Sequence, residues 1–508
     1  MKTPVTDTPD RSVAHDGAAA LPPAPPSPAA LPAPYAPPAP PAPSAGTRPS
    51  GAPRSRHRTL TVPLFLAVTG LLSLVCASYA ACRRALRRLT PHEKRVARLG
   101  ATVRRRAGER AGLLCTGSGA GVRAALRTSS PTCAARPVRL GLDAVLRLDT
   151  ERRVVRVEPG VTMGRLVRHL ARRGWTLPVA PGPDSATVGG LTMGCGVDAA
   201  SHRYGLFADT VESYDVLLGT GEVVRVSATE HPDLFHALPW SRGSLGFVVA
   251  VELRVVPARP WVEVRYHPVA GPEEMCRDLT RLAEAADGPA FVEGFVHGPG
   301  EGVVVTAEFA DRPRGRRNHV RRWYKPSFRA HARARARTGA VEYVPLGHYH
   351  RRHGRGLLGH PRHAVAQEAL VPAHHLEDLV RHCRQVFEEA DGLWVRPARL
   401  TRGATPGLVG PGPEVGAGQR QLFMDVAVLA GAPGRARRGA LRDAEDAARR
   451  FAAWVNARQG FQAVPHAPSG PARDEHRSMF DCWLYDRVRH AYGAEGVFVD
   501  AYDRAASR

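Results

Sequence analysis

Residues Val157–Gly205, VEPGVTMGRLVRHLARRGWTLPVAPGPDSATVGGLTMGCGVDAASHRYG, decide the fold of this 508-residue chain. Residues 161–173 repeat apolar side chains at helical spacing and end in two arginines before Gly174, which predicts a short amphipathic helix. Six glycines then follow between Gly182 and Gly205. Glycine lets backbone N–H groups come close to a phosphate, although a glycine-rich run without a lysine can equally be a tight structural turn.

The motifs around this stretch favour a ligand-binding loop. Upstream, the strand-like residues 113–115 lead into TGSGAG at 116–121, a weak phosphate-loop pattern by itself. Downstream, YDVLLGTGEVVRVS at 214–227 is typical of a β-hairpin, and GSLGF at 243–247 predicts a turn into a core strand. A dinucleotide cradle is the function that this order indicates.

The pattern changes after Arg259, which indicates a second domain. We expect strands near 261–267, 291–296 and 303–309, and helices near 273–286 and 376–390. A chain of this length has room for two domains of ordinary size.

The N-terminus contains two segments of unusual composition. Residues 1–58 are rich in Pro and Ala and are predicted to be disordered. Residues 60–81 contain no charged residue and are long enough to cross a bilayer, which predicts one retained transmembrane helix over 59–82. More arginine and lysine follow this segment than precede it, so the single-pass topology places the catalytic part in the cytoplasm.

The charge and the metal-ligating residue types exclude other classes of protein. The formal net charge is +24, but arginine is spread along the chain and is not interleaved with aromatic residues, so we expect no nucleic-acid partner. The eight cysteines show no ligand spacing and are expected to be reduced thiols. The histidines of HYHRRH at 348–353 have no acidic or cysteine partner at a suitable offset, so we expect no metal.

The order of the motifs resembles the flavin-binding domain of vanillyl-alcohol-oxidase-type enzymes. Within that superfamily, EPGVTMG, TVGGLTMGCGVDAASHRYGLF, LPWSRGSLGF, YKPSF and EYVPLGHYHRRH are similar to motifs of the Δ24-sterol reductase (diminuto/seladin) family. The resemblance implies an α+β fold: a two-subdomain PCMH-type FAD-binding domain at 90–258 and an α/β cap domain at 259–508, preceded by the transmembrane helix. Sterol reductases carry an apolar insertion after HRRHGRGLLG, and the corresponding segment is much shorter in this chain.

The resemblance also implies noncovalent FAD and a set of residues that bind it. The flavin-linking histidine of related enzymes lies in the first loop, which here is occupied by glycines. The implied cofactor-binding residues are Gly117, Ser118, Gly119, Pro181, Thr187, Gly189, Gly190, Gly194, Ser201, His202, Tyr204, Gly205, Leu245, Gly246 and Val248.

The family reaction is an NADPH-dependent reduction of a C=C bond in the side chain of a lipid. An isolated alkene accepts hydride poorly, so a positioned acid is required. The candidates in the cap motifs are Tyr343, His348, Tyr349, His350 and His353, with Lys325 as a charge partner. The sequence leaves two alternatives open: an alcohol or aldonolactone oxidase on the same fold, and a flavoprotein without catalytic activity.

Overall fold

The described residues of the computed structural model are Ser78 and residues 90–107, 112–116, 136–182, 184–298, 300–319, 326–353, 363–387, 390–404, 407–431, 438–462, 474 and 477–502. The chain divides into two units, 1–78 and 79–508, and every element described below belongs to the second. The expected tail at 1–58 and, apart from Ser78, the expected span at 59–82 lie outside the described residues. Within the part that is described, no helix combines the length and apolar character that crossing a membrane requires.

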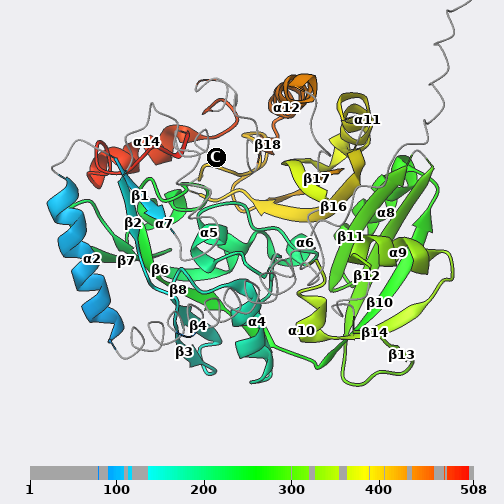
Figure 1. Ribbon diagram of the computed structural model, residues 1–508, viewed down its shortest axis with the longest axis horizontal. Coiled ribbons are helices and arrows are strands. Elements are labelled where there is room, and N and C mark those ends of the chain that lie inside the picture. Colours follow the sequence, from blue (N-terminus) through cyan, green and yellow to red (C-terminus); the bar gives the residue numbers. More distant parts are fainter. Residues whose placement is uncertain are drawn as a thin grey trace, which may run out of the picture. The chain divides into compact units, whose positions relative to one another are not determined.

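A five-stranded antiparallel sheet forms the centre of the first domain (Figure 1). Its strands, in spatial order, are β3 (Val145–Asp149), β4 (Val154–Val157), β8 (Phe247–Arg254), β6 (Val211–Leu217) and β7 (Val223–Ser227). The connecting elements are α4 (Met163–Ala171), β5 (Trp175–Thr176), α5 (Val188–Thr192), α6 (Ser201–Tyr204), η1 (Phe207–Thr210), α7 (Pro232–Ala237) and β9 (Val256–Pro257). The expected amphipathic helix and the expected hairpin are therefore present as α4 and as β6 with β7.

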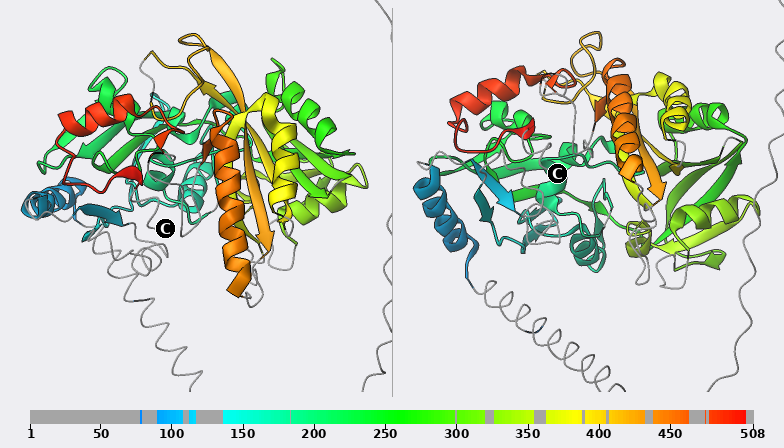
Figure 2. Two further views of the ribbon diagram at one scale, coloured as in Figure 1. Left: turned by 90° about the horizontal axis from the view of Figure 1, so that it is seen from above. Right: turned by 45° about the horizontal axis from the view of Figure 1, so that its top comes forward.

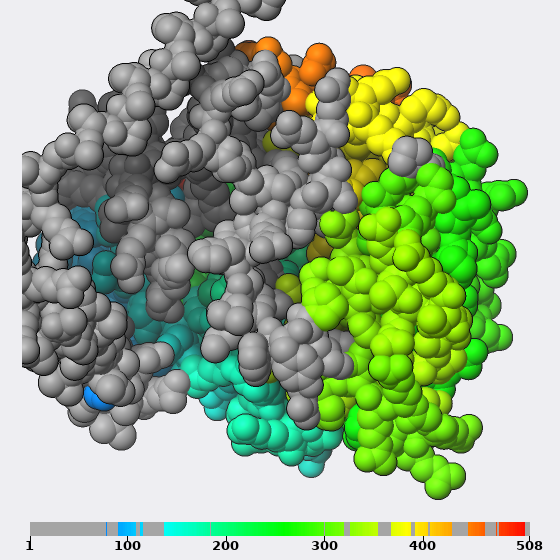
Figure 3. Space-filling view, turned by 45° about the vertical axis from the view of Figure 1, so that its right-hand side comes forward, coloured from blue at the N-terminus to red at the C-terminus, as the bar shows by residue number. Residues whose placement is uncertain are grey.

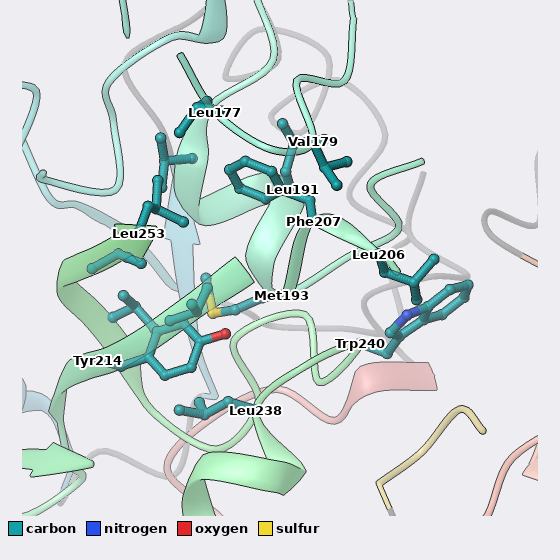
Figure 4. Packing of buried hydrophobic residues seen from close by; sticks show 14 of the residues in the cluster. Leu177, Val179, Leu191, Met193, Leu206, Phe207, Tyr214, Leu238, Trp240 and Leu253 are labelled. Atoms are coloured by element: carbon teal, nitrogen blue, oxygen red, sulfur yellow. The ribbon is translucent and has the colours of Figure 1, made fainter. Parts of the chain in front are cut away.

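The core of this domain lies between the sheet and the glycine-rich segment. Figure 4 shows Leu191, Val179 and Phe207 packed near one another, with Tyr214 and Leu253 contributed by the sheet. Each of these five side chains is buried. The apolar residues between the glycines thus fix the segment to the sheet.

A smaller layer packs on β6 and β8 from the opposite face of the sheet, and it brings residues 96–142 together with residues 494–498. Helix α2 (His92–Ala107) and the parallel pair β1 (Leu113–Thr116) and β2 (Arg136–Arg139) share a core with Phe247 and Phe498. Helix α14 (Cys482–Ala491) lies near this layer in Figure 1 but buries Leu484, Tyr485 and Val488 in the main core of the first domain. The Leu113 backbone N–H donates to Val497 O at 2.7 Å. The sequence assigned the whole of 259–508 to the cap, whereas residues 477–502 pack on the first domain.

The cap is built on a nine-stranded sheet with the order β13-β14-β10-β12-β11-β16-β17-β15-β18. Its strands are β10 (Trp261–Val269), β11 (Phe291–Gly298), β12 (Glu301–Ala310), β13 (Arg316–Arg317), β14 (Val341–Pro345), β15 (His363–Pro372), β16 (Ala390–Thr401), β17 (Arg420–Gly431) and β18 (Phe461–Gln462). Its helices are α8 (Pro272–Glu284), α9 (Phe328–Ala336), α10 (Leu346–Tyr349), η2 (Ala373–His375), α11 (Leu376–Val386) and α12 (Arg438–Asn456).

The two faces of the cap sheet have different coverings. Helices α8, α11 and α12 cover one face, and α11 and α12 lie alongside each other in Figure 2. The other face packs against α9 and α10 along β10–β12, and against the first domain along β15–β17, where Leu370, Ala398 and Phe423 join its core. In Figure 3 the green surface of the first part of the cap adjoins the yellow surface of its later part. One sheet face therefore meets the glycine-rich segment.

Candidate functional site

The glycine-rich segment folds back on the PGVTM stretch that precedes α4. The Met163 N–H donates to Ala186 O at 2.8 Å and the Val188 N–H donates to Val161 O at 2.9 Å. The Gly189 N–H donates to Pro159 O at 2.9 Å, and a Cβ on Gly189 would lie 2.6 Å from Pro159 Cβ. Only glycine fits at this close approach.

The half-buried Thr187 and the exposed Gly190 lie at the start of α5, and we call this edge the rim. The Thr187 hydroxyl accepts a hydrogen bond from the Gly190 N–H at 3.3 Å, so Thr187 is the N-cap of this short helix. Gly190 is exposed, while a Cβ on Gly194 would lie 2.6 Å from Gly190 O. Pro181 lies buried in the approach to this rim.

Residues 201–205 follow as one helical turn with a special backbone position at its end. The Ser201 hydroxyl is buried and accepts a hydrogen bond from the Asp198 N–H at 3.0 Å. Tyr204 is 40% exposed, and Gly205 has φ of +79°, in the region that favours glycine. A Cβ on Gly205 would also overlap the Asp209 carboxylate.

His202 joins this turn to the cap. Its Nδ1 lies 3.1 Å from Ala199 O and its Nε2 lies 2.9 Å from Pro289 O. Burial lowers the pKa of His202 to about 4, so the ring is neutral at pH 7 and donates its single N–H to one carbonyl at a time.

Leu245, Gly246 and Val248 lie at the entrance to β8. Leu245 and Val248 are fully buried in the core of the first domain. A Cβ on Gly246 would lie 2.6 Å from Val216 Cγ1, so packing against β6 requires this glycine. The expected first-loop residues Gly117, Ser118 and Gly119, and Lys325 of the cap, lie outside the described residues.

Three consecutive cap residues, 350–352, reach three parts of the first domain, and we call them the clamp. The pairs are His350 with Thr176, Arg351 with Asp184, and Arg352 with Asp198. Arg351 Nε lies 3.0 and 2.8 Å from the two Asp184 oxygens, five residues before Gly189. Charge-assisted pairs of this kind are stronger and more directional than neutral hydrogen bonds. The clamp therefore fixes the cap to the glycine-rich segment.

The candidate acids of the cap are held in separate environments. Tyr343 donates its hydroxyl hydrogen to Glu263 at 2.6 Å, and this contact raises its pKa. Tyr349 is buried against Phe291, and burial raises its pKa well above the usual value. The His348 ring packs edge-on against His319.

His350 is also buried, and its ring is bonded to the first domain. Its Nε2 lies 2.9 Å from Thr176 Oγ1, and burial lowers its pKa to about 4. The contacts of these four residues are those of structural side chains. Their role as the catalytic acid stays a prediction.

A buried carboxylate next to the clamp joins β11, β16 and the turn that follows α10. Glu293 on β11 accepts hydrogen bonds from Arg352 Nε at 2.8 Å, His353 Nε2 at 3.0 Å and Trp394 Nε1 at 2.9 Å. Burial alone would raise the pKa of Glu293, but the adjacent Arg352 and His353 hold it well below its usual range. His353 also faces Gly182, so this cluster borders the glycine-rich segment.

A second charged cluster lies on the same sheet face and was not found from the sequence. Arg396 on β16 pairs with Asp425 on β17 and with Glu368 on β15, and its Nη1 donates to Val197 O at 3.0 Å. These residues stand alone in apolar strands, so no short motif marks them. The alternation of polar and apolar residues in β16 and β17 was the available signal.

The glycine-rich segment fits the pyrophosphate of FAD. Its backbone packs too closely for side chains at Gly189 and Gly194, yet Gly190 stays exposed on the rim. A phosphate can approach a backbone with this form directly.

The comparisons with known proteins agree with this fit. The family described as "FAD binding domain" matches residues 97–227. A Delta(24)-sterol reductase of Homo sapiens is 32% identical over 458 residues, which cover 81% of this chain and 86% of that protein. The Arabidopsis thaliana protein of the same name is 32% identical over 425 residues (70% and 74%), and a Caenorhabditis elegans homolog is 30% identical over 418 residues (71% and 77%).

The fold and the matched domain define this chain as a flavoprotein oxidoreductase with a PCMH-type FAD-binding domain. Within that class, the similarity extends across both the FAD-binding domain and the cap. The chain belongs to the Δ24-sterol reductase family.

Proposed function

We propose that this protein is a membrane-anchored, FAD-dependent reductase that uses NADPH to reduce a C=C bond in the side chain of a sterol or isoprenoid-like lipid. The observation that carries the proposal is that the similarity to reductases covers the cap as well as the FAD-binding domain. A likeness confined to the FAD-binding domain would be shared with flavoenzymes of other reaction types.

The protein's own residues suit noncovalent binding of FAD. The residues proposed to hold the pyrophosphate are Thr187, Gly189 and Gly190, with Gly117, Ser118 and Gly119 in the first loop. The other proposed contacts are Pro181, Gly194, Ser201, His202, Tyr204, Gly205, Leu245, Gly246 and Val248. Bound FAD supplies hydride transfer, and the protein supplies binding, orientation and electrostatics.

The clamp and the neighbouring sheet face suit the remaining tasks. Arg351 ties the cap to the residues just before the rim, and Leu370 and Phe423 of the cap complete the core of the first domain. These contacts hold the cap against the glycine-rich segment.

The membrane anchor and the cytoplasmic catalytic part belong to this proposal. They rest on the uncharged stretch at 60–81 and the larger basic cluster after it. A lipid substrate is consistent with an enzyme that is held at a bilayer surface.

Product analysis tests the reaction. Protein purified in mild detergent should convert desmosterol, with NADPH, to a product that has gained two hydrogens across the side-chain alkene. If protonation leads, then in deuterated water solvent deuterium should appear on the less substituted alkene carbon. An unchanged alkene in the presence of bound FAD and NADPH would contradict the proposal.

Acid precipitation tests the noncovalent binding of the cofactor. The yellow colour should pass into the supernatant, because the described histidines near the glycine-rich segment are engaged in other contacts and the first loop contains none. Colour that stays with the precipitated protein would show a covalent link.

A further inference from the structure

The sheet register places Glu368, Arg396 and Asp425 side by side on one face of the cap. Arg396 and Asp425 are direct cross-strand partners, and Asp425 is also paired with Leu370. Glu368 is two residues from Leu370 and therefore points to the same face. Leu370 packs in the core of the first domain, so this is the face that meets the glycine-rich segment.

The charges of this cluster do not balance. The same nitrogen, Arg396 Nη2, contacts Asp425 Oδ2 and lies 2.5 Å from Glu368 Oε1. One guanidinium thus faces two carboxyl groups, and the acidic pair carries one more negative charge than Arg396 neutralises. Two carboxylates this close do not both ionise readily when they are buried, because each disfavours the charge of the other.

Burial is uneven within the cluster. The Asp425 side chain is fully buried, the Arg396 side chain is 5% exposed, and the Glu368 side chain is 23% exposed. Burial raises the pKa of Asp425 to about 7, Arg396 opposes the rise, and Glu368 adds to it. Asp425 Oδ1 makes no hydrogen bond within the described residues. Asp425 is therefore the better site for a proton, and Glu368 is open to water.

The groups that face this cluster come from the FAD-binding domain. Arg396 donates to Val197 O, which lies between Gly194 and Ser201. Burial raises the pKa of the Cys195 thiol, and the charged groups that also act on it are Glu368, Asp425, Arg396 and Arg242. The thiol therefore stays neutral. The cluster therefore borders the segment between two groups of proposed FAD contacts.

We propose that Asp425 is the proton donor of the alkene reduction, that Arg396 positions it, and that Glu368 returns the proton from water. This inference rests on the proposed function. In the step, the Asp425 O–H bond breaks and a C–H bond forms at the less substituted alkene carbon, while the hydride supplied by the reductase activity forms the second C–H bond. The Asp425 carboxylate then regains its proton from water through Glu368, so charge and atoms balance.

The test compares Asp425→Asn with Asp378→Asn in the FAD-loaded protein. Asp378 lies on α11 with a 55% exposed side chain, so it is a matched control outside the cluster. With NADPH under anaerobic conditions, the wild type and both variants should lose the yellow colour at similar rates. Recolouring by desmosterol should be about a hundredfold slower in Asp425→Asn alone, the range expected for a lost general acid.

Infrared spectroscopy gives a measurement that is independent of turnover. The wild type and Asp378→Asn should show a protonated carboxyl band at pH 7 that shifts in deuterated water, and Asp425→Asn should lack it. Absence of this band in the wild type would overturn the proposal. If desmosterol restores the colour of folded, FAD-bound Asp425→Asn as fast as that of the wild type, the inference is overturned but the proposed function is not.

Glu368→Gln keeps the proposal testable if Asp425→Asn does not fold. Removal of the neighbouring negative charge should lower the pKa of Asp425, so the alkene step should lose its rate at a lower pH than in the wild type. An unchanged pH profile would contradict the role of the pair. If desmosterol does not reoxidise the wild type at all, the proposed function fails and this inference fails with it.

Discussion

Gly189 and Gly190 are neighbours, but packing requires glycine only at Gly189, and the proposed FAD site requires it at Gly190. A Cβ at Gly189 would overlap Pro159 at 2.6 Å, whereas a Cβ at Gly190 would meet only the Thr187 hydroxyl at 3.1 Å. Gly189→Ala should therefore destabilise the first domain by about 1–3 kcal/mol, as overpacking does. A substitution at Gly190 can therefore test cofactor binding without changing the stability of the fold.

Gly190→Asp should abolish FAD binding and leave the fold intact. The carboxylate would lie on the exposed rim, where it would repel the pyrophosphate. Absorbance of the purified protein measures FAD content, and thermal unfolding without FAD measures stability. Gly300→Asp, in an open turn of the cap, is the control that should keep FAD. Full FAD occupancy in Gly190→Asp would contradict the proposed site.

Arg351→Gln should weaken FAD binding without contact between Arg351 and the cofactor. Loss of the partly buried pair with Asp184 removes about 1 kcal/mol of support from the glycine-rich segment, which raises the dissociation constant roughly fivefold. Fluorescence titration of the apoprotein with FAD measures this change. Arg381→Gln, which removes exposed pairs on α11, should leave the constant unchanged. Equal affinity for FAD in the two variants would show that the clamp does not support FAD binding.

At the scale of elements, Glu342 joins β14 to α9 and β10 through buried contacts. It accepts hydrogen bonds from Asn318, His331 and Tyr266. Burial alone would raise its pKa, but His331 and Asn318 hold the pKa near 2. A carboxyl group whose pKa is lowered by folding stabilises the native state above its unfolded value of 4.5, and this stability is lost as the pH falls toward 2.

Acid should therefore lower the free energy of unfolding of the protein, and this decrease should be smaller in Glu342→Gln. Between pH 6 and pH 3 the wild type should lose on the order of 2 kcal/mol more than the variant. Urea unfolding at the two pH values measures the difference. Equal losses in both proteins would show that Glu342 contributes nothing to the acid response.

Elements with a strong local pattern could be predicted from the sequence. The amphipathic helix α4, the β6–β7 hairpin and the strands β10, β11 and β12 lie within a few residues of their expected positions. Strands β16 and β17 were not assigned, because Arg396 and Asp425 interrupt runs that become regular only when the sheet has formed. Burial of these charges depends on partners distant in sequence, which local periodicity does not contain.

For the whole molecule, the sequence was sufficient to predict the family, but it did not predict the contacts that join the cap and the C-terminal residues to the FAD-binding domain. Long motifs such as TVGGLTMGCGVDAASHRYGLF identify the class. The return of residues 477–502 to the FAD-binding domain and the clamp at 350–352 are long-range contacts between segments without a shared pattern. The catalytic role of the candidates in HYHRRH stays a prediction, and the contacts that join this motif to the first domain are made by His350, Arg351 and Arg352.

The proposed membrane anchor also concerns the whole molecule. Carbonate washing should leave the full-length protein in membranes, while a protein that begins near Pro91 should be released, because the uncharged stretch at 60–81 is then absent. Protease added to intact cells should remove only the N-terminal tail. Digestion of the FAD-binding domain from outside would reverse the proposed topology.

In the proposed reaction, the bound flavin passes electrons from NADPH to an alkene. The measurement that tests it most directly is the absorbance of the FAD-loaded wild type, mixed without oxygen first with NADPH and then with desmosterol, with a separate mixture exposed to air. The yellow colour should disappear with NADPH and return with the alkene. No bleaching by NADPH, together with rapid bleaching by an alcohol and recolouring in air, would rule out the reductase and indicate an oxidase.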